Sequence, residues 1–334
     1  MSGTDRHYLR YVALGDSQTE GLGDGDDIVG LRGWADRLAE QLVRHSPDLR
    51  YANLAVRGRL AGQVHAEQLA PALALQPDLA TVVAGVNDLM RPRFDADEVA
   101  GHLEAMFAAL TAQGARVATL TFPDMTRIIP IARPLGSRIT ALNHRIRHAA
   151  RDHGVIVAET SHHPVVTDPR LWSQDRLHAG PLGHQRIAAA VAHALALPGS
   201  DDSWTHSLPP ESPPPAGWHA VHGELRWAAA FLGPWLGRRL RGRSSGDGRT
   251  AKRPNLLPVR TMAGTGQCGT GQCGTGQCGT GQCGTGQCGT GQCGTGQSRR
   301  QATETTAPKR PERARTAVRL RPQCRRHDLC TCLK

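Results

Sequence analysis

Residues 9–21 read LRYVALGDSQTEG, a short apolar run that leads directly into a Gly-Asp-Ser turn. Four more apolar runs follow before residue 160, and segments with apolar residues every three or four positions separate them. Strands that alternate with helices in this way predict a parallel sheet covered by helices on both faces. The predicted strands are 9–14, 49–54, 79–84, 115–122 and 154–158, and the helical stripes begin at Trp34, Val99, Ile139 and Ile187.

Composition divides the 334-residue chain near residue 197. Residues 1–200 carry a net charge of −1, whereas residues 201–334 carry +12, so the overall +11 is no evidence that the folded part binds nucleic acid. We expect an alternating α/β domain over 1–197, a Pro-rich linker over 198–215, a Trp- and Arg-rich helical extension over 216–260, and a disordered, low-complexity basic tail over 261–334.

The chain has no run of 18 apolar residues, which predicts that no segment spans a membrane. Seven residues, MSGTDRH, precede the first predicted strand and are too few for a signal peptide, so we expect a cytoplasmic protein. Within the extension, apolar residues near helical spacing over 216–240 favour a helix docked on the domain. A helix in weak contact with a membrane surface is the alternative.

Cysteine usage argues against a disulfide scaffold and a zinc module. All nine cysteines lie at or beyond Cys268, mostly in tandem copies of TGQCG, and their spacing of five does not match metal-ligand spacings. His162 and His163 have no partner at a ligand spacing, so we expect no metal site.

Two motifs fail because of their surroundings. GTGQCG fits the dinucleotide pattern G-x-G-x-x-G, but no predicted strand precedes it and no predicted helix follows. Residues 242–246, GRSSG, fit the nucleophile-elbow pattern G-x-S-x-G, yet they lie in an Arg- and Gly-rich stretch without a buried strand. We interpret both as coincidences of composition.

Polar groups follow three of the predicted strands. Ser17 comes after the first, Gly58 after the second and Asn87 after the third, and the carboxyl ends of parallel strands meet at one edge of a sheet. Acyl transfer needs a nucleophile together with donors for the developing oxyanion. The segment WSQDRLHAGPLG adds His178 as a base, with Asp175 three residues earlier to orient it.

These residues occur in four ordered blocks, and at this point the sequence resembles the SGNH hydrolase superfamily, also called the GDSL-like lipase/acylhydrolase family. The resemblance implies a three-layer α/β/α sandwich with a five-stranded parallel sheet, of the flavodoxin-like kind, and ester hydrolysis without metal or cofactor. The blocks are Gly15-Asp16-Ser17, Gly58 preceded by Asn53, Gly85-Val86-Asn87-Asp88, and Asp175-Arg176-Leu177-His178.

The resemblance also implies roles for these residues. Ser17 would be the nucleophile, His178 the base and Asp175 the carboxylate that orients it. The N–H groups of Ser17 and Gly58, with the side-chain amide of Asn87, would form the oxyanion hole.

Nearby residues are expected to be structural. We expect Asp16 and Asp88 to brace loops, and we rank His184 below His178 as the base because it falls inside a predicted helix. The chain departs from the family pattern at Gln18, where Leu is usual, and at Ala55, where Gly is frequent. We expect Arg57, Arg91, Arg93 and Arg176, which lie beside the motifs, to be ordinary solvated side chains rather than contacts for an anionic substrate.

The sequence therefore predicts a serine esterase with a small-molecule ester as its partner. A thioesterase, a lysophospholipase or a carbohydrate deacetylase could use the same site. A non-catalytic binding module is the rival from another class, but the four intact blocks argue against it. Any contact of the basic tail with nucleic acid would be non-specific. Nothing in the sequence predicts an oligomeric state.

Overall fold

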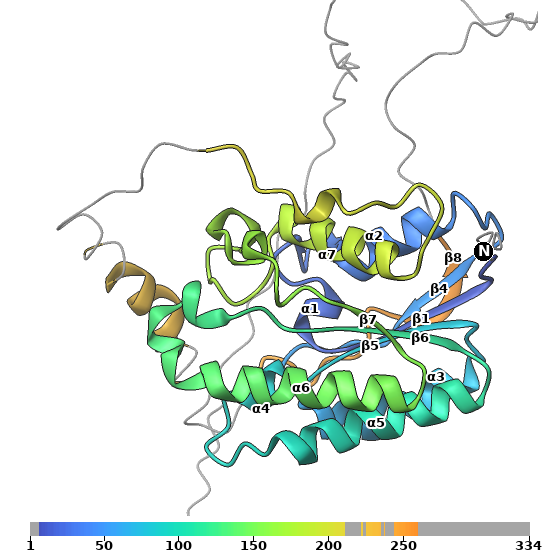
Figure 1. Ribbon diagram of the computed structural model, residues 1–334, viewed down its shortest axis with the longest axis horizontal. Helices are drawn as coiled ribbons and strands as arrows, with labels where there is room; N and C mark the ends of the chain where they lie inside the picture. The colour runs from blue at the N-terminus through green and yellow to red at the C-terminus, as the bar shows by residue number, and fades with distance from the viewer. Residues whose placement is uncertain (1–6, 211–221, 223–224, 235–236, 238–243, 260–334) are drawn as a thin grey trace, which may run out of the picture. The chain divides into compact units, whose positions relative to one another are not determined.

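The computed structural model of the protein describes residues 7–210, 222, 225–234, 237 and 244–259. Its central sheet has six strands in the order β7-β6-β5-β1-β4-β8, of which the first five are parallel (Figure 1). These five are the predicted strands, and their parallel pairing confirms the predicted α/β class. They are β1 (Arg10–Gly15), β4 (Arg50–Asn53), β5 (Leu79–Val83), β6 (Arg116–Leu120) and β7 (Ile156–Ala158).

Helices cover both faces of the sheet and complete the three layers. Helices α2 (Trp34–Leu42) and α7 (Pro181–Ala194) contact each other on one face, and α3 (Ala61–Ala74), α5 (Ala96–Ala112) and α6 (Gly136–Asp152) pack on the other (Figure 1). The short helices α1 (Ser17–Glu20) and α4 (Val86–Leu89) follow β1 and β5 directly. A small hairpin joins β2 (Gly25–Asp26) to β3 (Gly30–Leu31). Short 3₁₀ segments occupy Met125–Arg127, Pro130–Leu135, Pro164–Thr167, Pro169–Leu171 and Ser203–Thr205.

Helix α5 illustrates how local sequence specifies an element. Asp95 accepts hydrogen bonds from the N–H groups of Asp97 and Glu98, which have no partner inside the helix, and the predicted stripe that begins at Val99 is buried. At α6 the expected N-cap, Ser137, lies one residue inside the helix instead, because the helix continues from the 3₁₀ segment before it.

The sixth strand, β8 (Arg253–Pro258), corrects the prediction of a helical extension over 216–260. Part of that extension is helical, including a π-helical turn at Ala228–Leu232, but its end pairs antiparallel with β4. Pro254 and Pro258 weaken the strand signal in the sequence. They are tolerated because β8 is an edge strand, where a missing N–H need not leave a ladder bond unmade. The sheet therefore draws on residues beyond the predicted 1–197 domain.

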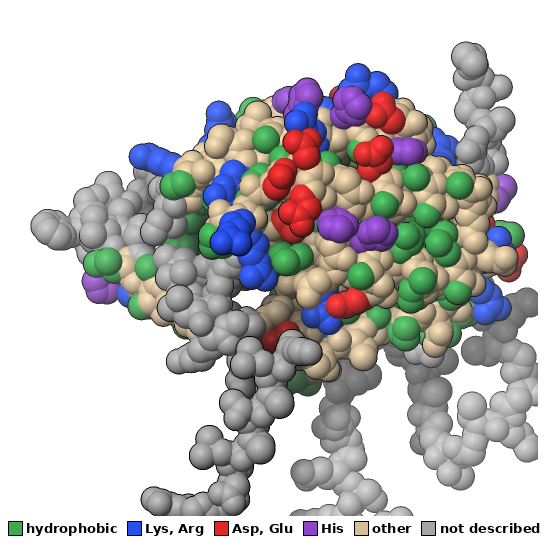
Figure 2. Space-filling view, turned by 90° about the horizontal axis from the view of Figure 1, so that it is seen from below, with side chains coloured by type: hydrophobic (Ala, Val, Ile, Leu, Met, Phe, Trp, Pro, Cys, Tyr) green, Lys and Arg blue, Asp and Glu red, His purple; other side chains and the backbone are tan. Residues whose placement is uncertain are grey.

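Charges of both signs are mixed on the face that α5 and α6 present to solvent (Figure 2). Arg145 pairs there with Asp97 of α5, and His153 approaches Glu104. Surface pairs of this kind contribute little to stability. No helix among the described residues is long and apolar enough to cross a membrane. The TGQCG repeat, the tail over 261–334 and parts of the linker and extension lie outside the described residues.

Candidate active site

Ser17, His178 and Asp175 form a continuous hydrogen-bonded line. Ser17 is the first residue of α1, and its Oγ lies 2.9 Å from His178 Nε2. On the other side of the ring, His178 Nδ1 lies 2.6 Å from Asp175 Oδ2. Nucleophile, base and orienting carboxylate are thus within hydrogen-bond distance of one another, although His178 is 161 residues from Ser17 in the chain.

The segment that carries His178 is a closed turn. Ser173 N–H donates to the His178 carbonyl at 2.8 Å, and Trp172 pairs with Ala179 in an antiparallel bridge. Asp175 Oδ1 accepts from Ser173 Oγ and from the N–H groups of Leu177 and His178. These bonds fix the carboxylate so that its second oxygen faces the imidazole.

The electrostatics of Asp175 suit that position. Burial raises the pKa of this carboxyl, but hydrogen bonds from His178 and Ser173 and the attraction of the imidazole outweigh burial and hold the pKa well below its usual range. Asp175 therefore stays ionised at neutral pH. An ionised acceptor at Nδ1 keeps the proton on that nitrogen and leaves Nε2 free to accept from Ser17.

Three donors lie near the nucleophile on adjacent strand ends. The register of β1 with β5 places Gly15 opposite Val83, and a Cβ at Gly15 would lie 2.5 Å from the Val83 carbonyl oxygen, so only glycine fits this approach. The backbone of Gly58 has a φ of +75°, a left-handed conformation that favours glycine. The N–H groups of Ser17 and Gly58 donate to no other described residue.

The amide of Asn87 is already engaged. It donates to Asp16 Oδ2 at 3.1 Å and to the Arg59 carbonyl at 3.0 Å, which accounts for both of its N–H groups. Donation to a substrate oxygen would therefore require one of these bonds to be shared or exchanged.

Asp16 lies beneath the site. It is 2% exposed, and its Oδ1 accepts from the Gln18 N–H at 3.2 Å, which caps α1. Burial raises the pKa of Asp16 to about 7, although the hydrogen bond from Gln18 opposes that rise. Asp88, the other carboxylate expected to brace a loop, accepts from the N–H of Ala61 at the start of α3.

His184, the weaker candidate for the base, is enclosed. Its Nδ1 accepts from the Trp34 N–H at 3.1 Å and its Nε2 donates to the Leu22 carbonyl at 2.9 Å. Burial lowers the pKa of His184 to about 4, so it is neutral in the fold. With both ring nitrogens occupied, His184 ties α7 to α2.

Arg57 is not the solvated arginine that the sequence suggests. It is 9% exposed, and its Nη2 pairs with Glu20 Oε1 at 2.6 Å, while its N–H donates to Glu20 Oε2 at the same distance. Asp27 approaches the same guanidinium at 2.9 Å. The pair fixes the backbone immediately before Gly58.

The GRSSG segment has a structural place that sequence reasoning missed. Ser244 Oγ donates to the Gly58 carbonyl at 3.4 Å, and a Cβ at Gly246 would lie only 2.0 Å from the Arg57 carbonyl oxygen. Ser244 is therefore no nucleophile elbow but part of a turn that packs on the Gly58 loop. No local signal in the sequence points to this contact, because about 190 residues separate its partners.

Gln18, where the family usually has Leu, connects the two halves of the site. Its Nε2 donates to the Leu177 carbonyl at 3.0 Å, and its Oε1 accepts from the Ala179 N–H at 3.2 Å. These two residues flank His178, so one side chain holds the nucleophile's helix against the base's turn.

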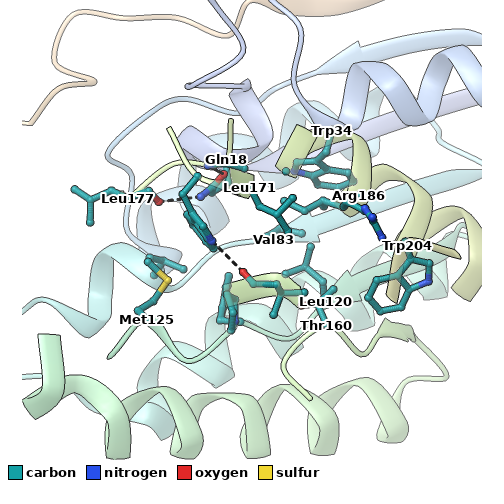
Figure 3. A pocket seen from close by; sticks show the side chains of 18 of the residues that line it. Gln18, Trp34, Val83, Leu120, Met125, Thr160, Leu171, Leu177, Arg186 and Trp204 are labelled. Carbon is teal, nitrogen blue, oxygen red and sulfur yellow. Dashed lines mark hydrogen bonds between the residues drawn. The ribbon is translucent and has the colours of Figure 1, made fainter. Parts of the chain in front are cut away.

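An apolar cavity lies beside these residues (Figure 3). Its space, open mouth included, is about 810 Å³. Among the described residues, no group of three or more His, Cys, Asp or Glu is arranged to hold a metal ion.

The solved structures that resemble this chain share its fold. An acetylxylan esterase from Geobacillus stearothermophilus, a catalytic mutant, is 15% identical over 60% of this chain and 100% of that one, with a TM-score of 0.50. LAE5, an α/β hydrolase enzyme from the metagenome of Lake Arreo, Spain, is 22% identical over 58% of this chain and 98% of its own, with a TM-score of 0.49.

The family is given by the sequence match. No curated protein matches the chain. Residues 13–186, just over half of it, match the GDSL-like Lipase/Acylhydrolase family, and this span contains Ser17, Asn87, Asp175 and His178. The chain therefore belongs to the GDSL-like lipase/acylhydrolase family, whose members are hydrolases that act on esters.

Proposed function

We propose that this chain is a serine esterase that cleaves an O-acyl bond through Ser17, His178 and Asp175. The observation that carries the proposal is the hydrogen-bonded line from Ser17 Oγ through the imidazole to Asp175, with contacts of 2.9 and 2.6 Å. An isolated serine hydroxyl is a weak nucleophile at neutral pH, and an adjacent oriented base is the arrangement that activates it.

The reaction runs in two halves. Ser17 Oγ attacks the ester carbonyl carbon while His178 Nε2 takes the hydroxyl proton, and the resulting imidazolium then gives that proton to the departing alcohol. Water attacks the acyl-enzyme in the second half, again with His178 as base, and the free acid leaves. Asp175 stays ionised throughout and stabilises the imidazolium.

The negative charge that forms on the carbonyl oxygen needs donors. The N–H groups of Ser17 and Gly58 are suited to this role, since no described residue accepts from either. The amide of Asn87 is the third donor in this proposal, with its bond to Asp16 or to Arg59 shared as the oxyanion forms.

A thioesterase, a lysophospholipase or a carbohydrate deacetylase would use the same groups. The acetylxylan esterase with the similar fold acts on an acetylated sugar, but a likeness of 15% identity supports the fold alone. A non-catalytic binding module is the rival from another class. The unbroken line of Ser17, His178 and Asp175 argues against it.

The test is hydrolysis of chromogenic esters of increasing acyl length by the full chain, with Ser17→Ala as the inactive variant. Ser137→Ala is the matched control, because Ser137 is exposed on α6 and distant from the site. An organophosphonate that reacts with activated serines should add its mass to the peptide containing Ser17 and to no other. Ester hydrolysis that survives Ser17→Ala would overturn the proposal.

A further inference from the structure

The apolar cavity beside the site has an elongated outline and two different ends (Figure 3). Leu177 and Met125 lie at one end, and Trp34, Arg186 and Trp204 lie at the other. Trp34 and Trp204 are 0% and 7% exposed, whereas Leu177 and Met125 are partly exposed. The cavity is therefore open beside the turn that carries His178 and closed between α2, α7 and the 3₁₀ segment Ser203–Thr205.

The open end adjoins the proposed catalytic groups. Gln18 follows the nucleophile in the chain, Val86 precedes Asn87, and Leu177 and Ala179 flank His178; all four line the cavity. The carboxyl ends of β5 and β6 contribute Val83 and Leu120 to its floor, the region where ligands bind in open parallel sheets. The cavity thus continues from the site rather than forming a separate void in the core.

The walls suit a hydrocarbon. Most lining residues are aliphatic or aromatic, and the hydroxyl, amide and guanidinium groups among them already have partners. Thr160 bonds to the Thr121 carbonyl, Gln18 to Leu177 and Ala179, and Arg186 donates to the Ser203 carbonyl at 2.7 Å. The rim residue Trp172 is held in place by its indole N–H, which donates to the Val166 carbonyl at 2.9 Å. A bound chain would therefore gain apolar burial without breaking these side-chain bonds.

We propose that this cavity, here called the acyl pocket, binds the hydrocarbon chain of a medium-length acyl ester while its carbonyl lies at Ser17. This inference rests on the proposed serine esterase function and adds the substrate class. The space of about 810 Å³, open mouth included, falls within the ~300–1,000 Å³ typical of small-molecule sites. An acetyl group would leave nearly all of it empty, and the closed end at Trp34 and Trp204 sets an upper limit on length.

The first experiment measures kcat/KM of the full chain for p-nitrophenyl esters from acetyl to palmitoyl. Each methylene buried is worth about fourfold in binding, so we expect the octanoyl ester to exceed the acetyl ester by at least about 10²-fold. The value should fall again for palmitoyl, which exceeds the depth of the pocket. A profile that is flat or highest at acetyl, with hydrolysis still abolished by Ser17→Ala, overturns the acyl pocket and leaves the esterase proposal standing.

Filling the pocket should remove the preference for long chains. Val166→Trp places an indole on the wall, and Met125→Trp does so at the mouth; both residues are partly exposed, so a larger side chain has room to adjust. Thr167→Trp is the matched control, since Thr167 shares the 3₁₀ turn of Val166 but does not line the pocket. We expect both filling variants to keep acetyl ester hydrolysis and to lose at least about tenfold for octanoyl. Equal losses for both esters would contradict the proposal.

A binding measurement separates chain recognition from turnover. Octanoate and acetate are titrated calorimetrically into the Ser17→Ala protein. We expect octanoate to bind with a negative heat-capacity change and acetate to show no measurable binding. Absence of octanoate binding, together with a flat ester profile, overturns the acyl pocket. Absence of any Ser17-dependent hydrolysis instead overturns the proposed function itself.

Discussion

The side-chain amide of Asn87 donates to the carboxylate of Asp16 over 3.1 Å, so a proposed oxyanion donor is held by a buried acid from the neighbouring strand end. Asp16 also caps α1 through the Gln18 N–H. One carboxylate therefore sets both the start of the nucleophile's helix and the orientation of the amide. Its ionisation affects both.

Stability should depend on pH through Asp16. Burial raises its pKa from 3.8 to about 7, so between these values the folded state holds a proton that the unfolded chain has released. The contribution of Asp16 to folding is thus most favourable below pH 4 and is lost as the pH rises towards 7 and beyond. Asp16→Asn removes this dependence. We expect the Tm of Asp16→Asn relative to wild type to increase by several degrees from pH 4 to pH 8, measured by thermal unfolding. A difference that is constant with pH would show that Asp16 does not titrate in this range.

Replacing the nucleophile or the base should abolish turnover. We expect Ser17→Ala and His178→Ala each to reduce kcat by on the order of 10⁴–10⁶, and Asp175→Ala to cost less because it orients rather than transfers the proton. Steady-state kinetics with a short ester measure this. If His184→Ala abolished kcat in a folded protein while His178→Ala did not, the base would be misassigned.

Asn87→Ala should lower kcat by about 10²–10³ with little change in KM, because the charge it stabilises exists mainly in the transition state. The control is Asn143→Ala, an amide that bonds both the N–H and the carbonyl of Phe122 and should affect stability instead. A large increase in KM for Asn87→Ala at unchanged kcat would move this residue from catalysis to substrate binding.

Gly246→Val should impair catalysis from outside the family-matched segment. A Cβ there would meet the Arg57 carbonyl at 2.0 Å, so the loop must move, and Gly58 moves with it. We expect kcat to fall by at least about tenfold with a small change in KM. Gly248→Ala is the matched control: it has the left-handed φ of +72° but no neighbour within 4 Å of an added Cβ. Equal effects of the two substitutions would trace the loss to backbone strain in the turn.

Truncation after Val259 should leave kcat/KM for a small ester and the Tm nearly unchanged. The proposed catalytic groups and β8 all precede this point, and the sequence beyond it has little apolar content to bury. The truncated protein should also lose all nine thiols in a titration and adsorb less to polyanions. A Tm several degrees lower, or loss of most activity, would mean that the removed segment packs on the enzyme.

The sequence predicted the parts of the fold that depend on local patterns. Apolar runs specify the five parallel strands, and Asp95 with its buried stripe specifies α5. Ser17, Asn87 and His178 are placed by the same logic, since each follows a strand or precedes a helix that the sequence marks. What it could not predict depends on contacts across long separations. Arg57 resembles a surface residue until Glu20 is brought beside it, and Ser244 has no visible role until it meets Gly58.

β8 affects the order in which this protein can be made. His178 leaves the ribosome well before Arg253, and at ~5–20 residues per second that interval lasts several seconds. Until β8 arrives, the outer edge of β4 has unpaired backbone groups, a template on which strands of other chains can form. The nascent chain therefore holds every proposed catalytic side chain before its sheet is closed. Slow translation between these two points should favour intermolecular strand pairing over the native edge.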